Sequence, residues 1–341
     1  MKQLERLVVH VAEAVRLGLS DNEPELRLGL MLLDSAAELM MYRESDYVLR
    51  MKESIYGPSL RHAEQMNEHT GQGADEDARI KAELVSNTRR RRIYHEFDAK
   101  CEFLVEQGTL PQPHSRALRK LHEYRNETHH RDEVRSATLA SATRIYAFLV
   151  CTMMSTMPVH SIGITGEPPA AIRKYIRSGE SGFGAALELQ ARIGRELLAA
   201  TGIAEPMDLG AALSDHVANR LDELEDALGE CVSFFDAMND RGWDADAILG
   251  FIQAPEPDDP YDHLRRTVQD FRKWAKPVSA AELRSWRRDG KDLAGQVDDL
   301  QAFTTFAEIE DAFEPIERKV LDLALDVERE IQHQTDAYRG K

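Results

Sequence analysis

Apolar residues recur at intervals of three and four along almost the whole chain. Near the N-terminus, Leu4, Leu7, Val8, Val11 and Val15 follow this spacing and define one face of a helix. Three further helices are expected to end at Gly57-Pro58, near Gly108 and before Pro158. In the rest of the chain, helices are expected over residues 184–200, 208–239, 261–275, 279–300 and 315–338. No run alternates like a strand, and no hairpin turn separates two apolar runs. The fold is therefore predicted to be all-α.

The segment SIGITGEPPA, residues 161–170, is rich in Gly and Pro and is the best candidate for a domain boundary. We expect a helical domain over residues 1–160 and a second all-helical domain over residues 161–341. Charge divides in the same way. Residues 1–160 carry 22 basic and 24 acidic residues, whereas residues 161–341 carry 21 basic and 36 acidic residues.

Composition excludes several classes of protein. The chain has 341 residues, of which 42% are hydrophobic and 30% charged, so it can bury a core and is neither disordered nor collagen-like. Its longest apolar run is shorter than the roughly 20 residues of a membrane-spanning helix. Three widely spaced cysteines without a CxxC pair indicate a reducing compartment and no structural zinc site. We expect a cytoplasmic protein that does not enter the membrane. A net charge of −17 excludes a non-specific nucleic-acid coat.

The segment LHEYRNETHHRDEVR, residues 121–135, is the densest polar stretch and directly precedes an apolar helix. On a helix, Asn126 and His130 lie one turn apart on the same side, and Arg125 lies at the edge of that side. An arginine offers a rigid fork to a phosphate, and a histidine can move a proton near neutral pH. These groups suffice for RNA cleavage without a metal, because the 2′-hydroxyl is an internal nucleophile.

The run RNETHH, Arg125 to His130, resembles the signature of the HEPN (higher eukaryotes and prokaryotes nucleotide-binding) family, many members of which are ribonucleases in toxin–antitoxin, CRISPR and abortive-infection systems. In that signature an arginine precedes a polar residue, and a histidine follows after four to six intervening residues. The long apolar helix that carries Asp34 and Glu38 one turn apart is similar to the family's long first helices. The resemblance covers residues 20–158, so it implies a HEPN-like helical bundle at the N-terminus.

The resemblance also implies roles for these residues. His130 would be the general base or acid, Arg125 would stabilise charge on the scissile phosphate, and Asn126 would orient one of them. The products would be a 2′,3′-cyclic phosphate and a 5′-hydroxyl, with neither metal nor other cofactor. Because family members usually pair two motifs across a dimer, a homodimer is expected, with an antitoxin or other regulatory protein as a further partner. The setting would be stress response or antiphage defence.

Basic residues elsewhere are candidate RNA contacts. His129 and Arg131 flank His130, and Arg91 and Arg92 belong to the run Arg89–Arg92, which is either a solvated helix face or a patch that steers RNA. Residues 264–291 hold nine basic and three acidic residues with interleaved tryptophans, a pattern that suits single-stranded RNA but also a helix core. The candidates there are Trp274, Arg287 and Arg288.

Two other functions remain open. A HEPN-like unit without activity would serve as a helical module that binds RNA or protein, or that dimerises. Alternatively, the Glu-x-x-His pairs Glu127–His130 and Glu330–His333 are spaced as in di-iron carboxylate bundles, and bound iron would reveal a metal–carboxylate oxidase.

Overall fold

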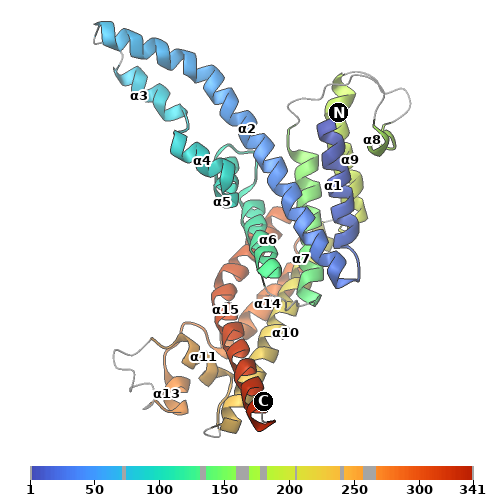
Figure 1. Ribbon diagram of the computed structural model, residues 1–341, viewed down its shortest axis with the longest axis vertical. Coiled ribbons are helices and arrows are strands. Elements are labelled where there is room, and N and C mark those ends of the chain that lie inside the picture. The colour runs from blue at the N-terminus through green and yellow to red at the C-terminus, as the bar shows by residue number, and fades with distance from the viewer. Residues whose placement is uncertain are drawn as a thin grey trace. The chain divides into compact units, whose positions relative to one another are not determined.

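The computed structural model describes residues 2–70, 74–130, 136–158, 169–176, 183–203, 206–238, 242–255 and 266–339 (Figure 1). Within these ranges, the side chains of residues 2, 68–70, 74–77, 127–130, 136–137, 183–187 and 206 are not described. The described chain consists of helices joined by short connections and contains no strand, which confirms the prediction of an all-α protein. None of these helices combines the length and the apolar character that crossing a membrane requires.

The chain forms two compact units, residues 1–205 and residues 206–341. This division lies further along the chain than the expected one at residues 160/161. The reason is α9 (Phe183–Ala200), which packs along α7 (Ser136–Thr156) and so belongs to the first unit. Gly194 of α9 allows the close approach, since a Cβ there would lie 2.8 Å from the backbone nitrogen of Ser155.

The core of the first unit lies between α1 (Lys2–Gly18), α2 (Glu23–Thr70) and α7 (Figure 1). The apolar face expected for α1 is buried, with Leu7 and Val11 almost fully covered. The α1–α2 junction is close because a Cβ at Gly29 would lie 2.5 Å from the backbone nitrogen of Gly18. Helix α8 (Ala170–Arg173) packs against α1.

Helix α2 does not end at Gly57-Pro58 as predicted but continues to Thr70. A proline inside a helix removes one backbone hydrogen bond, and packing of the second half of α2 against α3 (Ala74–Glu83) offsets this loss. Helix α3 begins inside the polar segment HTGQGADED, residues 69–77, whose composition is typical of a loop. The basic helix ends near Gly108 as predicted, but extended backbone at Glu96 divides it into α4 (Asn87–His95) and α5 (Phe97–Glu106).

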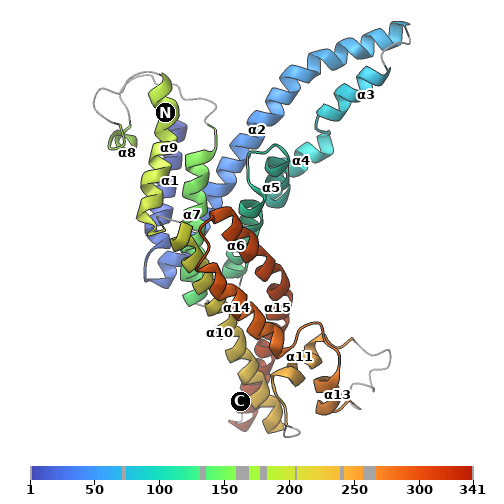
Figure 2. The ribbon, with the colours of Figure 1, turned by 180° about the vertical axis from the view of Figure 1, so that it is seen from behind.

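The second unit is built on α10 (Pro206–Met238), α14 (Ala280–Leu293) and α15 (Asp299–Tyr338), which pack against one another (Figure 2). Helix α15 passes through Pro315, where the sequence suggested that a helix begins. Residues 294–298 separate α14 from α15, so the helix expected over 279–300 ends early. Two short helices, α11 (Ala245–Gln253) and α13 (Val268–Lys273), pack together, and α11 was not predicted.

A charged cluster is buried in the second unit. The guanidinium of Arg220 on α10 donates to the carboxylates of Glu310 and Glu317 on α15, and its carbon lies 5.0 Å from the ring centroid of Phe313. Only 2% of the Arg220 side chain is exposed. One turn before Arg220, His216 is fully buried and tilts against Phe306 at a ring-centroid distance of 5.7 Å. Burial, and secondarily the charge of Arg220, hold the pKa of His216 well below its usual value.

We expect the stability of the second unit to fall as the pH drops below about 6.5, the ordinary pKa of an unfolded histidine. Below that pH the unfolded chain binds a proton at His216 that the folded chain does not, so His216 costs up to about 1.4 kcal/mol per pH unit. All three tryptophans, Trp243, Trp274 and Trp286, belong to this unit, so their fluorescence follows its unfolding. Urea unfolding between pH 7.5 and 5.5 should give a smaller pH dependence for His216→Leu than for wild type. The exposed His333 gives the matched control, His333→Leu, which should retain the wild-type slope.

Candidate active site

The site centres on Asp34, a carboxylate buried in the apolar face of α2. Its neighbours come from α6 (Gln112–His130) and α7, both of which pack against α2. Four groups contact it, two on each carboxylate oxygen. They are the Tyr146 hydroxyl, His122 Nδ1, and two nitrogens of Arg125. A buried carboxylate is stable only when hydrogen bonds and opposite charge replace its water, and this set supplies both.

Arg125 lies at the boundary between this cluster and solvent. Its Nε and one terminal nitrogen are each 2.9 Å from Asp34 Oδ2, and its other terminal nitrogen donates to Asn126 Oδ1 at 2.8 Å. The side chain is 30% exposed. A guanidinium has five N–H donors, so these contacts leave donors for an anion that arrives from solvent. The structure therefore brings together two of the three predicted catalytic residues, Arg125 and Asn126.

His122 lies one turn before Arg125 on α6 and shares its carboxylate. Its Nδ1 is 2.7 Å from Asp34 Oδ1, and its ring stacks on Phe97 with centroids 4.0 Å apart and planes 9° apart. An Nδ1–H that donates to the carboxylate leaves Nε2 as the acceptor of the neutral ring. With 20% of the side chain exposed, His122 is accessible to solvent.

Tyr146 closes the buried side of the cluster. Its hydroxyl donates to Asp34 Oδ1 at 2.9 Å, and the residue is completely buried on α7. Burial, and secondarily the Asp34 carboxylate, raise the pKa of Tyr146 well above its usual value, so the phenol remains a donor. Helices α2, α6 and α7 are thus joined at one carboxylate.

The remaining motif residues are His129, His130 and Arg131. The backbone of His129 and His130 forms the last residues of that helix, which places His130 one turn after Asn126 as expected. The side chains of His129 and His130 lie outside the described residues, as does the whole of Arg131. Their predicted roles stay predictions.

The arginine run lies on α4, where acidic partners engage most of it. Arg89 pairs with Glu106, Arg90 pairs with Glu53 at 3.0 Å, and Arg92 pairs with Glu96 at 2.9 Å. Arg91 is exposed. Ion pairs reduce the charge that the run presents to RNA, so Arg91 is the candidate of this helix that keeps its charge available.

The tryptophan-containing candidates belong to the second unit. Arg287 on α14 donates to Asp222 at 2.7 Å and to Glu225 at 3.1 Å, both on α10. Arg288 is exposed, and the partly exposed Trp274 follows the last residue of α13. The local positive charge of this segment is therefore partly neutralised by the acidic helix beside it.

The metal alternative gains no support from the described residues. Among them, no group of three or more His, Cys, Asp and Glu side chains is arranged to hold a metal ion. Glu330 on α15 accepts from Gln334 at 2.8 Å, and His333 is exposed. The side chains of the other pair, Glu127 and His130, lie outside the described part of the chain.

Sequence reasoning did not assign His122, Tyr146 or Asp34 to the site. The sequence does contain an indication for Asp34, because it is a carboxylate within an apolar run, and a buried carboxylate needs a polar partner. The indication for His122 is weaker: it precedes Arg125 by three residues and therefore lies on the same face of the helix. Tyr146 lies in an apolar helix, and nothing in its local sequence distinguishes it from core aromatics.

We compared the chain with models of known protein families, with curated proteins and with solved structures, and none of the three comparisons finds a match.

Proposed function

We propose that the chain is an endoribonuclease that cleaves RNA without a metal by attack of the 2′-hydroxyl. The observation that carries this proposal is the buried Asp34 carboxylate, which fixes the guanidinium of Arg125 at a partly exposed position beside Asn126. A preorganised cation of this kind stabilises charge that develops on a phosphate during transfer.

In the proposed reaction, the 2′-oxygen attacks the adjacent phosphorus and the 5′-oxygen leaves. His130 either takes the proton from the 2′-hydroxyl or gives one to the leaving 5′-oxygen, and solvent water carries the other proton. Arg125 neutralises charge on the non-bridging oxygens. Asn126 accepts from Arg125 and so orients its fork. His122 and Tyr146 are positioning residues that fix Asp34 and, through it, Arg125. The products are a 2′,3′-cyclic phosphate and a 5′-hydroxyl.

The resemblance to HEPN ribonucleases adds a setting and partners to this proposal. A homodimer would bring two copies of the Arg125–His130 motif together, and an antitoxin or another regulatory protein would restrain cleavage. Stress response or antiphage defence is the setting that the resemblance favours.

The proposal predicts that the full chain cleaves total RNA and tRNA in excess EDTA and leaves cyclic-phosphate ends. His130→Ala and Arg125→Lys should each lower the cleavage rate by roughly a hundredfold or more, because the first removes the proton carrier and the second keeps the charge but loses the fork. His333→Ala, the same change at an exposed histidine of α15, is the control and should cleave like wild type.

Two results would contradict the assignment. Equal cleavage by wild type and His130→Ala would place the activity elsewhere or in a contaminant. RNA binding without cleavage, unchanged in all variants, would instead favour a non-catalytic module that binds RNA or protein.

A further inference from the structure

A cleft on the first unit lies apart from the Asp34 cluster and is formed by side chains of α1, α2, α9 and the end of α7. Its volume is about 510 Å³. Pockets of a few hundred to a thousand cubic ångströms are typical of sites for small organic molecules. The cleft is therefore large enough for a ligand with one or two rings.

The walls of the cleft differ between its base and its rim. Leu7 and Met40 contribute apolar side chains, and both residues are buried. Tyr42 and Tyr47 also line it, and these two residues are 42% and 37% exposed. Exposed tyrosine rings beside apolar side chains provide a surface on which an aromatic body can stack.

Arg43 is the charged group of the cleft that has no counter-charge among the residues that the structure describes. It is half-buried, and its two terminal nitrogens each lie 3.5 Å from the carbonyl oxygen of Gln3, the outer limit of a hydrogen bond. Two carboxylates, Glu44 and Asp46, line the same cleft. Among the described residues, no carboxylate pairs with Arg43, these two included. Burial lowers the pKa of Arg43, because removal from water disfavours the charged form of the guanidinium.

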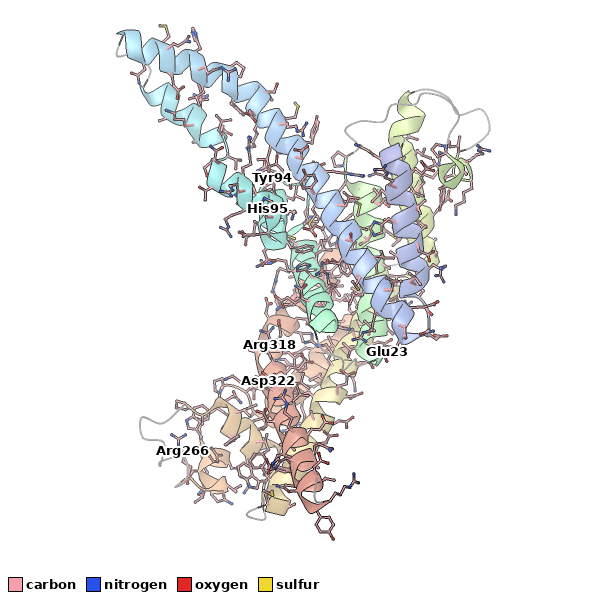
Figure 3. The ribbon with its side chains drawn as sticks, viewed as in Figure 1. Glu23, Tyr94, His95, Arg266, Arg318 and Asp322 are labelled. Carbon is pink, nitrogen blue, oxygen red and sulfur yellow. The ribbon has the colours of Figure 1, made fainter. Side chains whose placement is uncertain are left out.

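A second arginine in the same cleft provides the contrast. Arg50 lies two turns further along α2 and pairs with Asp46 at 3.0 Å. The same carboxylate accepts from the hydroxyl of Tyr94 at 3.1 Å. Tyr94 lies on α4 (Figure 3). The charge of Arg50 is thus compensated within the protein, whereas that of Arg43 is available to a ligand.

We propose that this cleft binds a small organic anion with an aromatic body, whose anionic group is held by Arg43 and whose ring lies against Tyr42, Tyr47 and the apolar base. An anion there would supply the counter-charge that the described part of the chain does not, and a charge-assisted hydrogen bond in a partly buried site is among the stronger polar interactions. The inference does not depend on ribonuclease activity.

Two dyes of the same ring system test the proposal on the full-length protein. 8-Anilinonaphthalene-1-sulfonate carries a sulfonate, and N-phenyl-1-naphthylamine has the same rings without it. Arg43→Gln should raise the dissociation constant of the sulfonate roughly tenfold or more and leave that of the neutral dye unchanged. Arg50→Gln removes the same charge from the same helix and cleft, and it should change neither constant more than about twofold.

Sulfonate binding that survives Arg43→Gln, or that weakens equally in both variants, would overturn the proposal. If Arg43→Gln also loses binding of the neutral dye, the substitution has altered the shape of the cleft. The variant Arg43→Lys, which keeps the positive charge, then tests the proposal. Retained binding of both dyes by Arg43→Lys supports the proposal, and loss of both overturns it. Displacement of the sulfonate by adenosine 5′-monophosphate would identify a phosphate as the anionic group, and displacement by phenylacetate would identify a carboxylate. Displacement by neither would overturn the assignment.

Discussion

Replacement of Asp34 by alanine is expected to destabilise the first unit by about 3–5 kcal/mol. The substitution leaves the guanidinium of Arg125 and the fully buried hydroxyl of Tyr146 without their acceptor, and an uncompensated buried charge or donor is among the costliest defects in a core. The measurement is urea unfolding followed in parallel by circular dichroism and by tryptophan fluorescence. Because every tryptophan lies in the second unit, only the circular-dichroism transition of the first unit should move.

Asp34→Asn separates charge from shape. The amide keeps one acceptor oxygen and the volume of the carboxylate, so the unit should fold with a smaller loss than in Asp34→Ala. RNA cleavage should nevertheless fall in Asp34→Asn, because Arg125 is no longer held by two nitrogens on a charged group. A stable Asp34→Ala protein with wild-type cleavage would show that the cluster neither stabilises the unit nor positions Arg125.

Replacement of Arg220 by methionine should destabilise the second unit by a similar amount, about 3–5 kcal/mol. The change keeps much of the apolar stem but leaves the carboxylates of Glu310 and Glu317 buried without their cation. The midpoint of the tryptophan-fluorescence transition in urea reports this loss directly. The loss should shrink as the pH is lowered, since protonation removes the repelling charges.

The control for Arg220 is Arg329→Met on α15. Arg329 pairs with Asp326 at 3.1 Å, and its side chain is 77% exposed, so the midpoint should move little. The triple variant Arg220→Met, Glu310→Leu, Glu317→Leu should recover most of the stability lost in Arg220→Met, because an apolar cluster of similar volume replaces the buried ions. A small effect of Arg220→Met alone would mean that the two carboxylates are already neutral in the folded protein.

The helices could be predicted from the sequence because apolar spacing reports burial, but their ends could not always be predicted. Pro58 and Pro315 both suggested a helix boundary, but α2 continues through Pro58 and α15 continues through Pro315. A rule based on local sequence considers only the backbone hydrogen bond that a proline removes from a helix. In the protein, tertiary packing on either side of each proline outweighs that loss. Helix α11 was missed because its nine residues give too short a periodic pattern between polar segments.

The candidate site could be predicted only as far as local sequence reaches. Arg125 and Asn126 are neighbours in the chain, so their juxtaposition follows from the motif. Asp34 lies 88 residues before His122 and 112 before Tyr146, and no spacing rule joins residues so far apart. The ion pairs of Arg287 could likewise not be predicted from local sequence, because its acidic partners lie on α10, a separate helix.

The long sequence separation between Asp34 and its partners affects when this cluster can form during synthesis of the chain. Its carboxylate leaves the ribosome 112 residues before Tyr146. At synthesis rates of about 5–20 residues per second, roughly 6–20 s pass before the last partner exists. During that interval α1 and α2 can already pair, since they adjoin in sequence, while Asp34 keeps its water. Dehydration of this carboxylate therefore belongs to a late step of folding, when α6 and α7 close over α2.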